Sequence, residues 1–368
     1  MKLMAAHNAG GSRLPAPVAR DGGWAVIGGS ANRLWERGCF GKPTNGGVVL
    51  TNTEVLNAHR LRGLPLPNPK WLEEIVEVQG DIFFECEVLD ALRYPGEKVI
   101  LKQNLSAVSA VVLDQKTWAL RWSRSVQPKD DDPISEIRWF HASDTIDWKE
   151  ILQWTSNVES GGRIAELLIV DDEHGVVTYR TSLHQPTGKF RNPFTEMEND
   201  ERRLISKAWS LSKPTDNGYW IPSENMTWPL EGMGIELENG IWISNVEARI
   251  VSRVVNPTMP KPDGELGKLV AALSDLISRG LAIRSGFKYG TRWRGYSGAV
   301  GEDHAPWLIV PLDEAPLDWG EACLVARLAA GVNKNWLCAI PPQEIGGWRY
   351  LALERPPSDS RWANPKRH

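Results

Sequence analysis

The chain has 368 residues, of which 42% are hydrophobic and 24% are charged, and its formal net charge is -4 at pH 7. The length exceeds one typical domain, and the composition is that of a globular protein. The weakly acidic balance argues against a general nucleic-acid binder, although attraction to phosphates depends on local charge. No apolar run approaches a membrane span and the first residues lack a signal core, so neither membrane association nor secretion is expected.

The cysteines also indicate a location and exclude a type of site. They are scattered along the chain without a CxxC pair, at Cys39, Cys86, Cys323 and Cys338. This spacing favours reduced thiols over a disulfide framework or a zinc site. We therefore expect a cytoplasmic protein without a bound metal or cofactor.

The first predicted elements follow a leader. Residues 1–22 mix Gly, Pro, Ala and Arg without periodicity and predict a loose segment. Residues 24–27 and 47–50 predict strands. The second strand leads into the capping-box sequence from Thr51 to Glu54, which predicts a helix from Thr53 to about Leu61 that ends before Gly63.

A similar sequence pattern occurs again later in the chain. Residues 240–247 repeat the pattern of residues 47–54. From Arg121-Trp122 and Arg292-Trp293 onward, the two halves match at one fixed separation, as in Asp147-Trp148 with Asp318-Trp319. These matches indicate an internal duplication.

We therefore predict a mixed α/β (α+β) fold built by tandem duplication of one module. Each copy has a small helical/β N-terminal part and a nuclease-like α/β C-terminal part. The expected parts are, in order, a leader (1–22), an N-terminal subdomain (23–105), an inactive catalytic-like subdomain (106–185), a linker (186–217), a second N-terminal subdomain (218–262), a catalytic subdomain (263–356) and a tail (357–368).

The second catalytic-like part has the clearer pattern. Apolar residues recur at helical spacing from Leu266 to Ile277, and Gly280 follows them. Strands are predicted at 281–283, 307–310, 336–340 and 348–353, with a helix over 319–330 between the second and third.

This part also contains a local basic segment. No carboxylate lies between Asp275 and Glu302, whereas five basic residues do: Arg279, Arg284, Lys288, Arg292 and Arg294. Tyr296, His304 and Lys334 lie within or beside it. Such side chains can accept a proton, donate a proton and stabilise negative charge on a phosphate.

The segments 279–281 (RGL) and 284–290 (RSGFKYG), followed by Tyr296, His304 and Lys334, resemble the catalytic repeat of archaeal tRNA-splicing endonucleases (tRNA-intron lyases). The likeness extends over roughly 243–353. One departure is Asn333, where the family usually has an arginine.

The resemblance implies a function and roles for these residues. Tyr296 would be the base for the RNA 2′-OH, His304 the acid for the departing 5′-oxygen, and Lys334 the stabiliser of the phosphorane charge. The reaction would need no metal and would leave a 2′,3′-cyclic phosphate and a 5′-hydroxyl. The substrate would be precursor tRNA with a bulge-helix-bulge, and neither DNA nor a membrane is an expected partner.

Further RNA contacts are implied. Arg327 and Arg349 would sandwich a flipped base between two guanidinium planes; the alternative is a pair of surface salt bridges. Lys288, Arg292 and Arg294 would bind the RNA backbone.

The first copy differs at every one of these catalytic positions. At the fixed separation, Tyr296 corresponds to Ser125, His304 to Pro133 and Lys334 to Arg163, while the two clamp arginines correspond to Ser156 and Thr178. This copy is therefore predicted to be inactive. By resemblance, its acidic loop would dock into the partner chain of a homodimer, with a solvated turn as the alternative; the loop is Asp171, Asp172 and Glu173.

Two other functions remain open. A metal-dependent nuclease of the restriction type would need clustered carboxylates, for which the sequence offers Glu302-Asp303 and Asp313-Glu314. A non-catalytic structural or RNA-binding subunit of a splicing endonuclease would suit the first copy alone.

Overall fold

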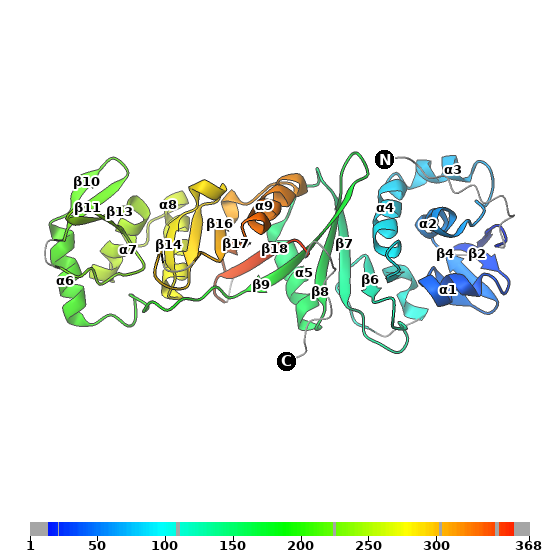
Figure 1. Cartoon of the computed structure of the whole chain (residues 1–368), viewed down its shortest axis with the longest axis horizontal. Helices are drawn as coiled ribbons and strands as arrows, with labels where there is room; N and C mark the ends of the chain where they lie inside the picture. The colour runs from blue at the N-terminus through cyan, green and yellow to red at the C-terminus, as the bar shows by residue number, and fades with distance from the viewer. Residues whose placement is uncertain are drawn as a thin grey trace. The chain divides into compact units, whose positions relative to one another are not determined.

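The computed structural model describes residues 14–20, 22–107, 111–223, 226–301, 304–342 and 346–356. Its fold is mixed α/β, as predicted (Figure 1). The chain divides into two compact units. Unit 1 holds the described residues before Ile146, together with 153–181 and Pro356, and unit 2 holds 146–152 with the described residues of 182–355. No helix within the described ranges is long and apolar enough to cross a membrane.

Each unit contains a small antiparallel sheet, and the strand order is the same in both. In unit 1 the order is β1 (Val18–Arg20), β2 (Gly23–Ile27), β4 (Gly47–Leu50) and β3 (Lys42–Thr44). In unit 2 it is β10 (Lys213–Thr215), β11 (Gly218–Pro222), β13 (Gly240–Ser244) and β12 (Ile235–Leu237).

The third strand of each small sheet runs directly into a helix. These helices are α2 (Asn52–Arg62) and α7 (Asn245–Val255). The predicted capping box of Thr51 and Glu54 is confirmed, and Ser244 and Glu247 form its counterpart in unit 2. In each case the hydroxyl and the carboxylate satisfy backbone amides that the first helical turn leaves without partners.

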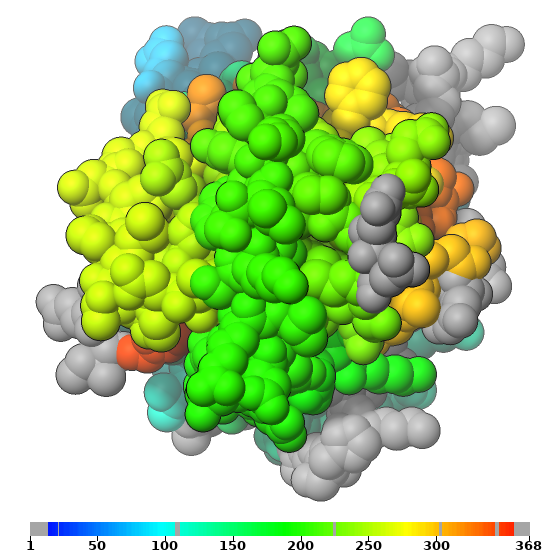
Figure 2. All heavy atoms as spheres, turned by 90° about the vertical axis from the view of Figure 1, so that its left-hand side faces the viewer, coloured from blue at the N-terminus to red at the C-terminus, as the bar shows by residue number. Residues whose placement is uncertain are grey.

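The segments predicted to be a linker and a loose leader both contain regular structure. The expected linker over 186–217 includes β10 and α6 (Asn199–Ser210), which runs across the face of unit 2 seen in Figure 2. Ile205 and Ala208 on α6 are buried in the unit 2 core. Apart from the exposed Leu204 and the partly buried Trp209, the rest of this helix is mostly polar, so its narrow apolar stripe was hidden in a charged sequence. The expected leader likewise includes β1, which pairs with β2.

Two further sets of five strands also share one order. Their strands are β5 (Lys98–Leu101), β6 (Ala119–Trp122), β7 (Ser135–His141), β8 (Ile164–Val170) and β9 (Val176–His184), and in unit 2 β14 (Ala282–Ser285), β15 (Trp293–Tyr296), β16 (Trp307–Pro311), β17 (Asn335–Ile340) and β18 (Arg349–Glu354). Within each set the third and fourth strands are parallel and the other neighbours are antiparallel. Parallel strands need a long crossover, and it contains α5 (Trp148–Ser160) or α9 (Trp319–Gly331).

The remaining helices complete the two units. Unit 1 has α1 (Asn32–Gly38), α3 (Trp71–Val78), α4 (Ile82–Arg93) and the 3-10 turn η1 (Lys102–Ala107). Unit 2 has α8 (Gly264–Ser278) and the 3-10 turns η2 (Phe287–Tyr289) and η3 (Leu312–Glu314).

The unit 2 core determines which side chains of β15 are free for chemistry. Trp293 is buried in one apolar cluster with residues of α7 and α8, together with Leu337 of β17. Because side chains alternate along a strand, Arg294 and Tyr296 lie on the other face of β15.

Candidate active site

Tyr296 is the last residue of β15 and is 7% exposed. It pairs with Ala282 of β14, and its ring packs in a small cluster with Ala282 and Ala305. The Arg294 guanidinium lies 5.8 Å from the centre of the Tyr296 ring. Backbone pairing and ring packing therefore fix this tyrosine beside a cation.

Lys334 reaches the same cluster from the turn between α9 and β17. Its Nζ donates a 2.5 Å hydrogen bond to the carbonyl oxygen of Ala305, and its backbone N–H bonds Ala329 O at 3.0 Å. The preceding residue, Asn333, has a left-handed backbone with φ 53°. Asparagine adopts this conformation more readily than arginine does, which gives a local reason for the departure from the family pattern.

His304 directly precedes Ala305 and is exposed. Ala305 both packs in the Tyr296 cluster and accepts the Lys334 hydrogen bond. The structure thus gathers the backbone at His304, the Tyr296 ring and the Lys334 ammonium around one residue. Glu302 and Asp303, the first carboxylate pair considered for a metal nuclease, lie outside the described residues.

Tyr289 is a site residue that our sequence reasoning missed. Its ring centre lies 5.6 Å from Lys334 Nζ and 5.9 Å from the Arg294 guanidinium. The ring therefore lies near both cations and can attract them through its π face. The available signal was the tyrosine of the RSGFKYG segment, which served only to identify the family resemblance.

A second missed feature is the segment Gly188–Phe190. Its three N–H groups bond Arg279 O at 2.9 Å, Ser297 O at 2.9 Å and Gly280 O at 3.1 Å. A Cβ on Gly188 would lie 1.9 Å from Gly280 O, so only glycine permits this approach. The segment is thereby held beside the end of β15.

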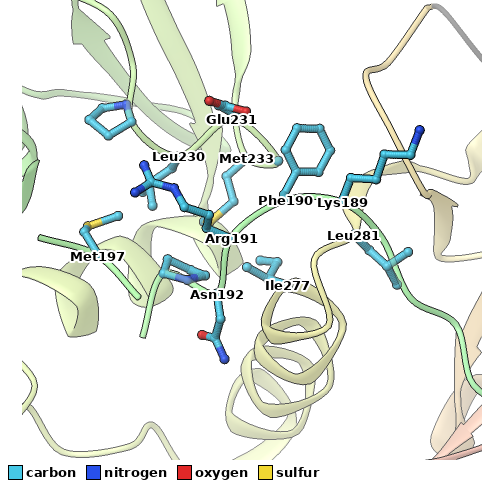
Figure 3. A pocket seen from close by; sticks show the side chains of 13 residues that line it. Lys189, Phe190, Arg191, Asn192, Met197, Leu230, Glu231, Met233, Ile277 and Leu281 are labelled. Atoms are coloured by element: carbon cyan, nitrogen blue, oxygen red, sulfur yellow. The ribbon is translucent and has the colours of Figure 1, made fainter. Parts of the chain in front are cut away.

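Phe190 of this segment packs against the Tyr296 cluster and also lines a pocket of about 260 Å³. Figure 3 shows the pocket, with Met197, Leu230 and Ile277 among its walls. Lys189 extends away from Arg191 and Met197 in this view. The segment therefore provides an aromatic wall for the site and an exposed lysine beside it.

Fewer residues of the predicted basic surface are available to a ligand than the sequence suggested. Arg279 bonds Asp275 at 2.6 Å and Trp348 O at 3.1 Å. Arg284 is half-buried and donates to the carbonyl oxygen of Gly232 at 3.1 Å, and burial lowers the pKa of its guanidinium. Both arginines are thus engaged in contacts that stabilise the fold.

The three basic residues predicted to bind RNA differ from one another. Arg292 is paired with both oxygens of Glu314. Arg294 donates to Ser285 O at 2.8 Å. Lys288 is exposed, and no ion pair holds it among the described residues. Lys288 is therefore the cation of this group most available to an added phosphate.

The predicted base clamp is not assembled by contacts within the described part of unit 2. Arg327 is exposed on α9, and Arg349 is half-buried at the start of β18. The side chain of neither makes an ion pair or a hydrogen bond there. The same α9 surface exposes Leu324 and Leu328, at 45% and 56%.

The acidic loop of unit 1 is exposed between β8 and β9. Asp171 Oδ1 accepts the N–H groups of Glu173 at 3.0 Å and Gly175 at 2.7 Å, so this carboxylate shapes the turn. The Asp172 side chain is 94% exposed and lies 3.2 Å from the His141 ring. Asp172 and Glu173 are thus exposed acidic groups of this loop, whereas Asp171 is engaged in the turn.

Strand register corrects one sequence equivalence. Tyr296 ends β15 and pairs with the first residue of β14, and Trp122 ends β6 and pairs with the first residue of β5. The structural counterpart of Tyr296 is therefore Trp122 rather than Ser125. The fixed-separation comparison failed here because the connections on both sides of this strand differ in length between the units.

Ion pairs occupy the corresponding region of unit 1. Arg163, which precedes β8 as Lys334 precedes β17, bonds Glu136 at 2.9 and 2.6 Å. The buried Arg121 guanidinium bonds Glu166 at 2.7 Å and Glu97 at 3.1 Å. These cations are already neutralised by carboxylates.

Side-chain chemistry defines the class of site in unit 2. Two cations, two tyrosines and an exposed histidine near the edge of an α/β sheet suit phosphate chemistry with proton transfer. Among the described residues, no group of three or more His, Cys, Asp or Glu side chains is arranged to hold a metal ion.

Residues 268–346 match the family described as tRNA intron endonuclease, catalytic C-terminal domain. The matched segment includes Tyr289, Tyr296, His304 and Lys334. The match lies in unit 2 and ends before Arg349.

Several similar proteins are named tRNA-splicing endonuclease. A tRNA-splicing endonuclease from Sulfurisphaera tokodaii is 31% identical over 87 residues, which are 23% of this chain and 48% of the relative. One from Hyperthermus butylicus is 33% identical over 93 residues, covering 25% and 47%. One from Thermoplasma volcanium is 41% identical over 63 residues, covering 17% and 21%. The alignments with the first two relatives span about half of each relative's length.

Proposed function

We propose that the chain is a tRNA-splicing endoribonuclease that cuts introns at bulge-helix-bulge junctions without a metal ion. The observation that carries this proposal is the gathering of Tyr296, Lys334 and the His304 backbone around Ala305, inside the segment that matches the catalytic domain. RNA brings its own nucleophile, the 2′-OH, so proton transfer and charge stabilisation suffice for the reaction.

Each residue has one role in this proposal. Tyr296 removes the proton of the 2′-OH, and the oxygen attacks the adjacent phosphorus. His304 donates a proton to the departing 5′-oxygen. Lys334 and Arg294 stabilise the negative charge that develops on the phosphorane. The bond that forms closes a 2′,3′-cyclic phosphate, and the bond that breaks leaves a 5′-hydroxyl.

The test is cleavage of a bulge-helix-bulge RNA by the purified chain in excess EDTA, with the product ends identified. We expect cutting with a 2′,3′-cyclic phosphate. Cutting only after Mg²⁺ is added would instead support the metal-dependent nuclease. If no cleavage occurs under either condition and a second purified subunit restores it, the chain would instead be a structural subunit.

We further propose that the two units are copies of one module and that unit 1 is inactive. Their shared sheet orders and capping boxes support this. Trp122 has no ionisable group for proton transfer, and Arg163 is neutralised by Glu136. A cytoplasmic location fits a tRNA-processing role.

The acidic loop is proposed to join two chains into a homodimer with two active sites. The 94% exposure of the Asp172 side chain supports this, because a basic pocket of a partner chain can reach it. Exchanging Asp171 and Asp172 for lysine is expected to give monomers in light scattering. An unchanged dimer with full activity would contradict the docking proposal.

Arg327 and Arg349 are proposed to clamp a bulged base, since both guanidinium groups are uncommitted within the described residues. Stacking on a base is tolerant of its identity. Recognition would then depend mainly on RNA shape.

Binding to the RNA phosphate backbone should depend on Lys288 more than on Arg292. Lys288→Ala is expected to weaken RNA binding and to reduce the slope of log K against log salt by about 0.7 to 0.9, the loss of one phosphate contact. Arg292→Ala is the matched control, because Glu314 already neutralises that guanidinium. Filter binding at several salt concentrations measures both. Equal slopes for the two variants would contradict the assignment of Lys288.

A further inference from the structure

Unit 1 contains a cavity of about 820 Å³ whose lining differs from that of the proposed catalytic site. It lies among the start of α2, the start of α4 and the strands β5 and β6. Its polar and aromatic lining includes Asn52, Thr53, Gln79, Glu85, Lys102 and Trp118. None of these residues belongs to the site around Tyr296.

Hydrogen bonds fix the orientation of the lining side chains. Trp24 Nε1 donates to Asn52 Oδ1 at 2.8 Å, and Asn52 Nδ2 donates to Gln79 Oε1 at 3.0 Å. Gln79 Nε2 donates to Glu85 Oε2 at 2.7 Å, and the Thr53 hydroxyl donates to the same oxygen. The other carboxylate oxygen, Oε1, accepts neither of these last two bonds, and Trp118 also bonds the carboxylate. A carboxylate has about four acceptor positions in all. The network therefore positions one acceptor without saturating it.

The Glu85 carboxylate lowers the stability of the fold when no ligand is bound. Burial raises the pKa of its carboxyl group, and the hydrogen bonds from Thr53, Gln79 and Trp118 only partly oppose this. Within the described part of the chain no cation pairs with it. A half-buried carboxylate without a cation costs free energy, so a ligand that donates hydrogen bonds would offset the cost.

Unit 2 shows that the fold does not require these polar groups. Val246 follows its N-cap at the same spacing as Thr53, and Leu269 precedes Gly280 by the same number of residues as Glu85 precedes Gly96. The corresponding cavity of unit 2, which Val246 and Leu269 line, has only about 250 Å³. The larger polar cavity is thus particular to unit 1.

We propose that this cavity binds a nucleobase with an exocyclic amino group, from an unpaired RNA nucleotide or a free nucleotide. The amino group donates to Glu85 Oε1, and the Trp118 ring offers an aromatic partner for stacking. Lys102 is exposed at the rim, where its Nζ donates to the carbonyl oxygen of Gln115 and adds a positive charge for the phosphate. Uracil lacks the amino group, and carbonyl oxygens flank its N3–H and repel a carboxylate.

The experiment uses the full chain and the double variant Thr53→Val with Glu85→Leu, which installs the side chains of unit 2. Calorimetric titration with AMP, GMP, CMP and UMP is compared with titration of single-stranded trinucleotides. We expect wild type to bind the amino-bearing ligands about tenfold or more tighter than the uracil ligands, the value of one charge-assisted hydrogen bond. The double variant should lose this preference.

Thermal unfolding shows that the variant is folded. Glu85 has a raised folded-state pKa, so its ionisation destabilises the fold as pH rises above the pKa of the unfolded chain. The variant should therefore unfold at the same or a higher temperature than wild type, and its advantage should grow from pH 4 to pH 8.

The two ligand sources give different results. Binding of mononucleotides with the stated preference identifies a free-nucleotide site, and binding of trinucleotides alone identifies an RNA site. No binding of either to wild type, equal binding of uracil ligands, or unchanged binding by a folded double variant would overturn the proposal. None of these outcomes alters the endonuclease proposal, whose test is cleavage.

Discussion

Replacing Lys334 with alanine is expected to slow cleavage of a bulge-helix-bulge RNA by about 10²- to 10³-fold, because one charge stabiliser of the transition state is lost. Tyr296→Phe and His304→Ala remove a base and an acid, and each should cost about 10²- to 10⁴-fold. Single-turnover rates at saturating enzyme measure the chemical step apart from binding. Lys268→Ala is the control, since this lysine is exposed and paired with Asp313.

The roles of acid and base can be separated with one modified substrate. An RNA with sulfur in place of the 5′-oxygen at the cleaved bond has a leaving group that needs no proton. His304→Ala should then cleave nearly as fast as wild type, whereas Tyr296→Phe should remain slow. A histidine variant that stays equally impaired on this substrate would contradict the assignment of the acid. Wild-type rates for all three variants would contradict the site as a whole.

The second large effect concerns the stability of unit 1. Arg121→Leu is expected to lower the free energy of unfolding by about 3 to 5 kcal/mol, because it leaves the buried Glu166 without its cation. Urea unfolding of the whole chain measures the loss. Hydrogen exchange of peptides from β6 to β8 assigns the loss to this unit.

A double variant tests whether the charge pair itself is needed. Arg121→Leu with Glu166→Leu should recover most of the lost stability, because an apolar pair can replace a buried ion pair at little cost. The third residue of β17, which corresponds to Glu166, is already Leu337 in unit 2. A double variant no more stable than the single one would show that a different interaction of Glu166 dominates.

Local sequence signals predicted much of the fold. The capping box at Thr51, the helix ending before Gly280 and the strands β14, β16, β17 and β18 were predicted because each depends on neighbouring residues. The strand β15, which ends at Tyr296, was not predicted. α6 was missed because its buried stripe contains few residues. The equivalence of Tyr296 with Ser125 was wrong because a fixed separation cannot represent connections of unequal length.

The candidate site was predicted less completely than the fold. Tyr296, His304 and Lys334 were proposed through a resemblance, and the structure places the Tyr296 ring, the Lys334 ammonium and the backbone of His304 around Ala305. Phe190 could not be found in this way, because its hydrogen bonds join segments far apart in the sequence. Composition predicted five available cations, but only the three-dimensional partners distinguish Lys288 from Arg292.

The glycine contact between Gly188 and Gly280 limits how the catalytic region can be shortened or rearranged. Residues 268–346 contain the proposed catalytic groups, yet a wall of their site comes from Phe190, well before that segment begins. A fragment cut at the domain match would expose the flank of Tyr296 to solvent. A functional transplant of this catalytic region into another scaffold must therefore include the peptide around Gly188, and insertions at that point would separate the wall from the tyrosine it covers.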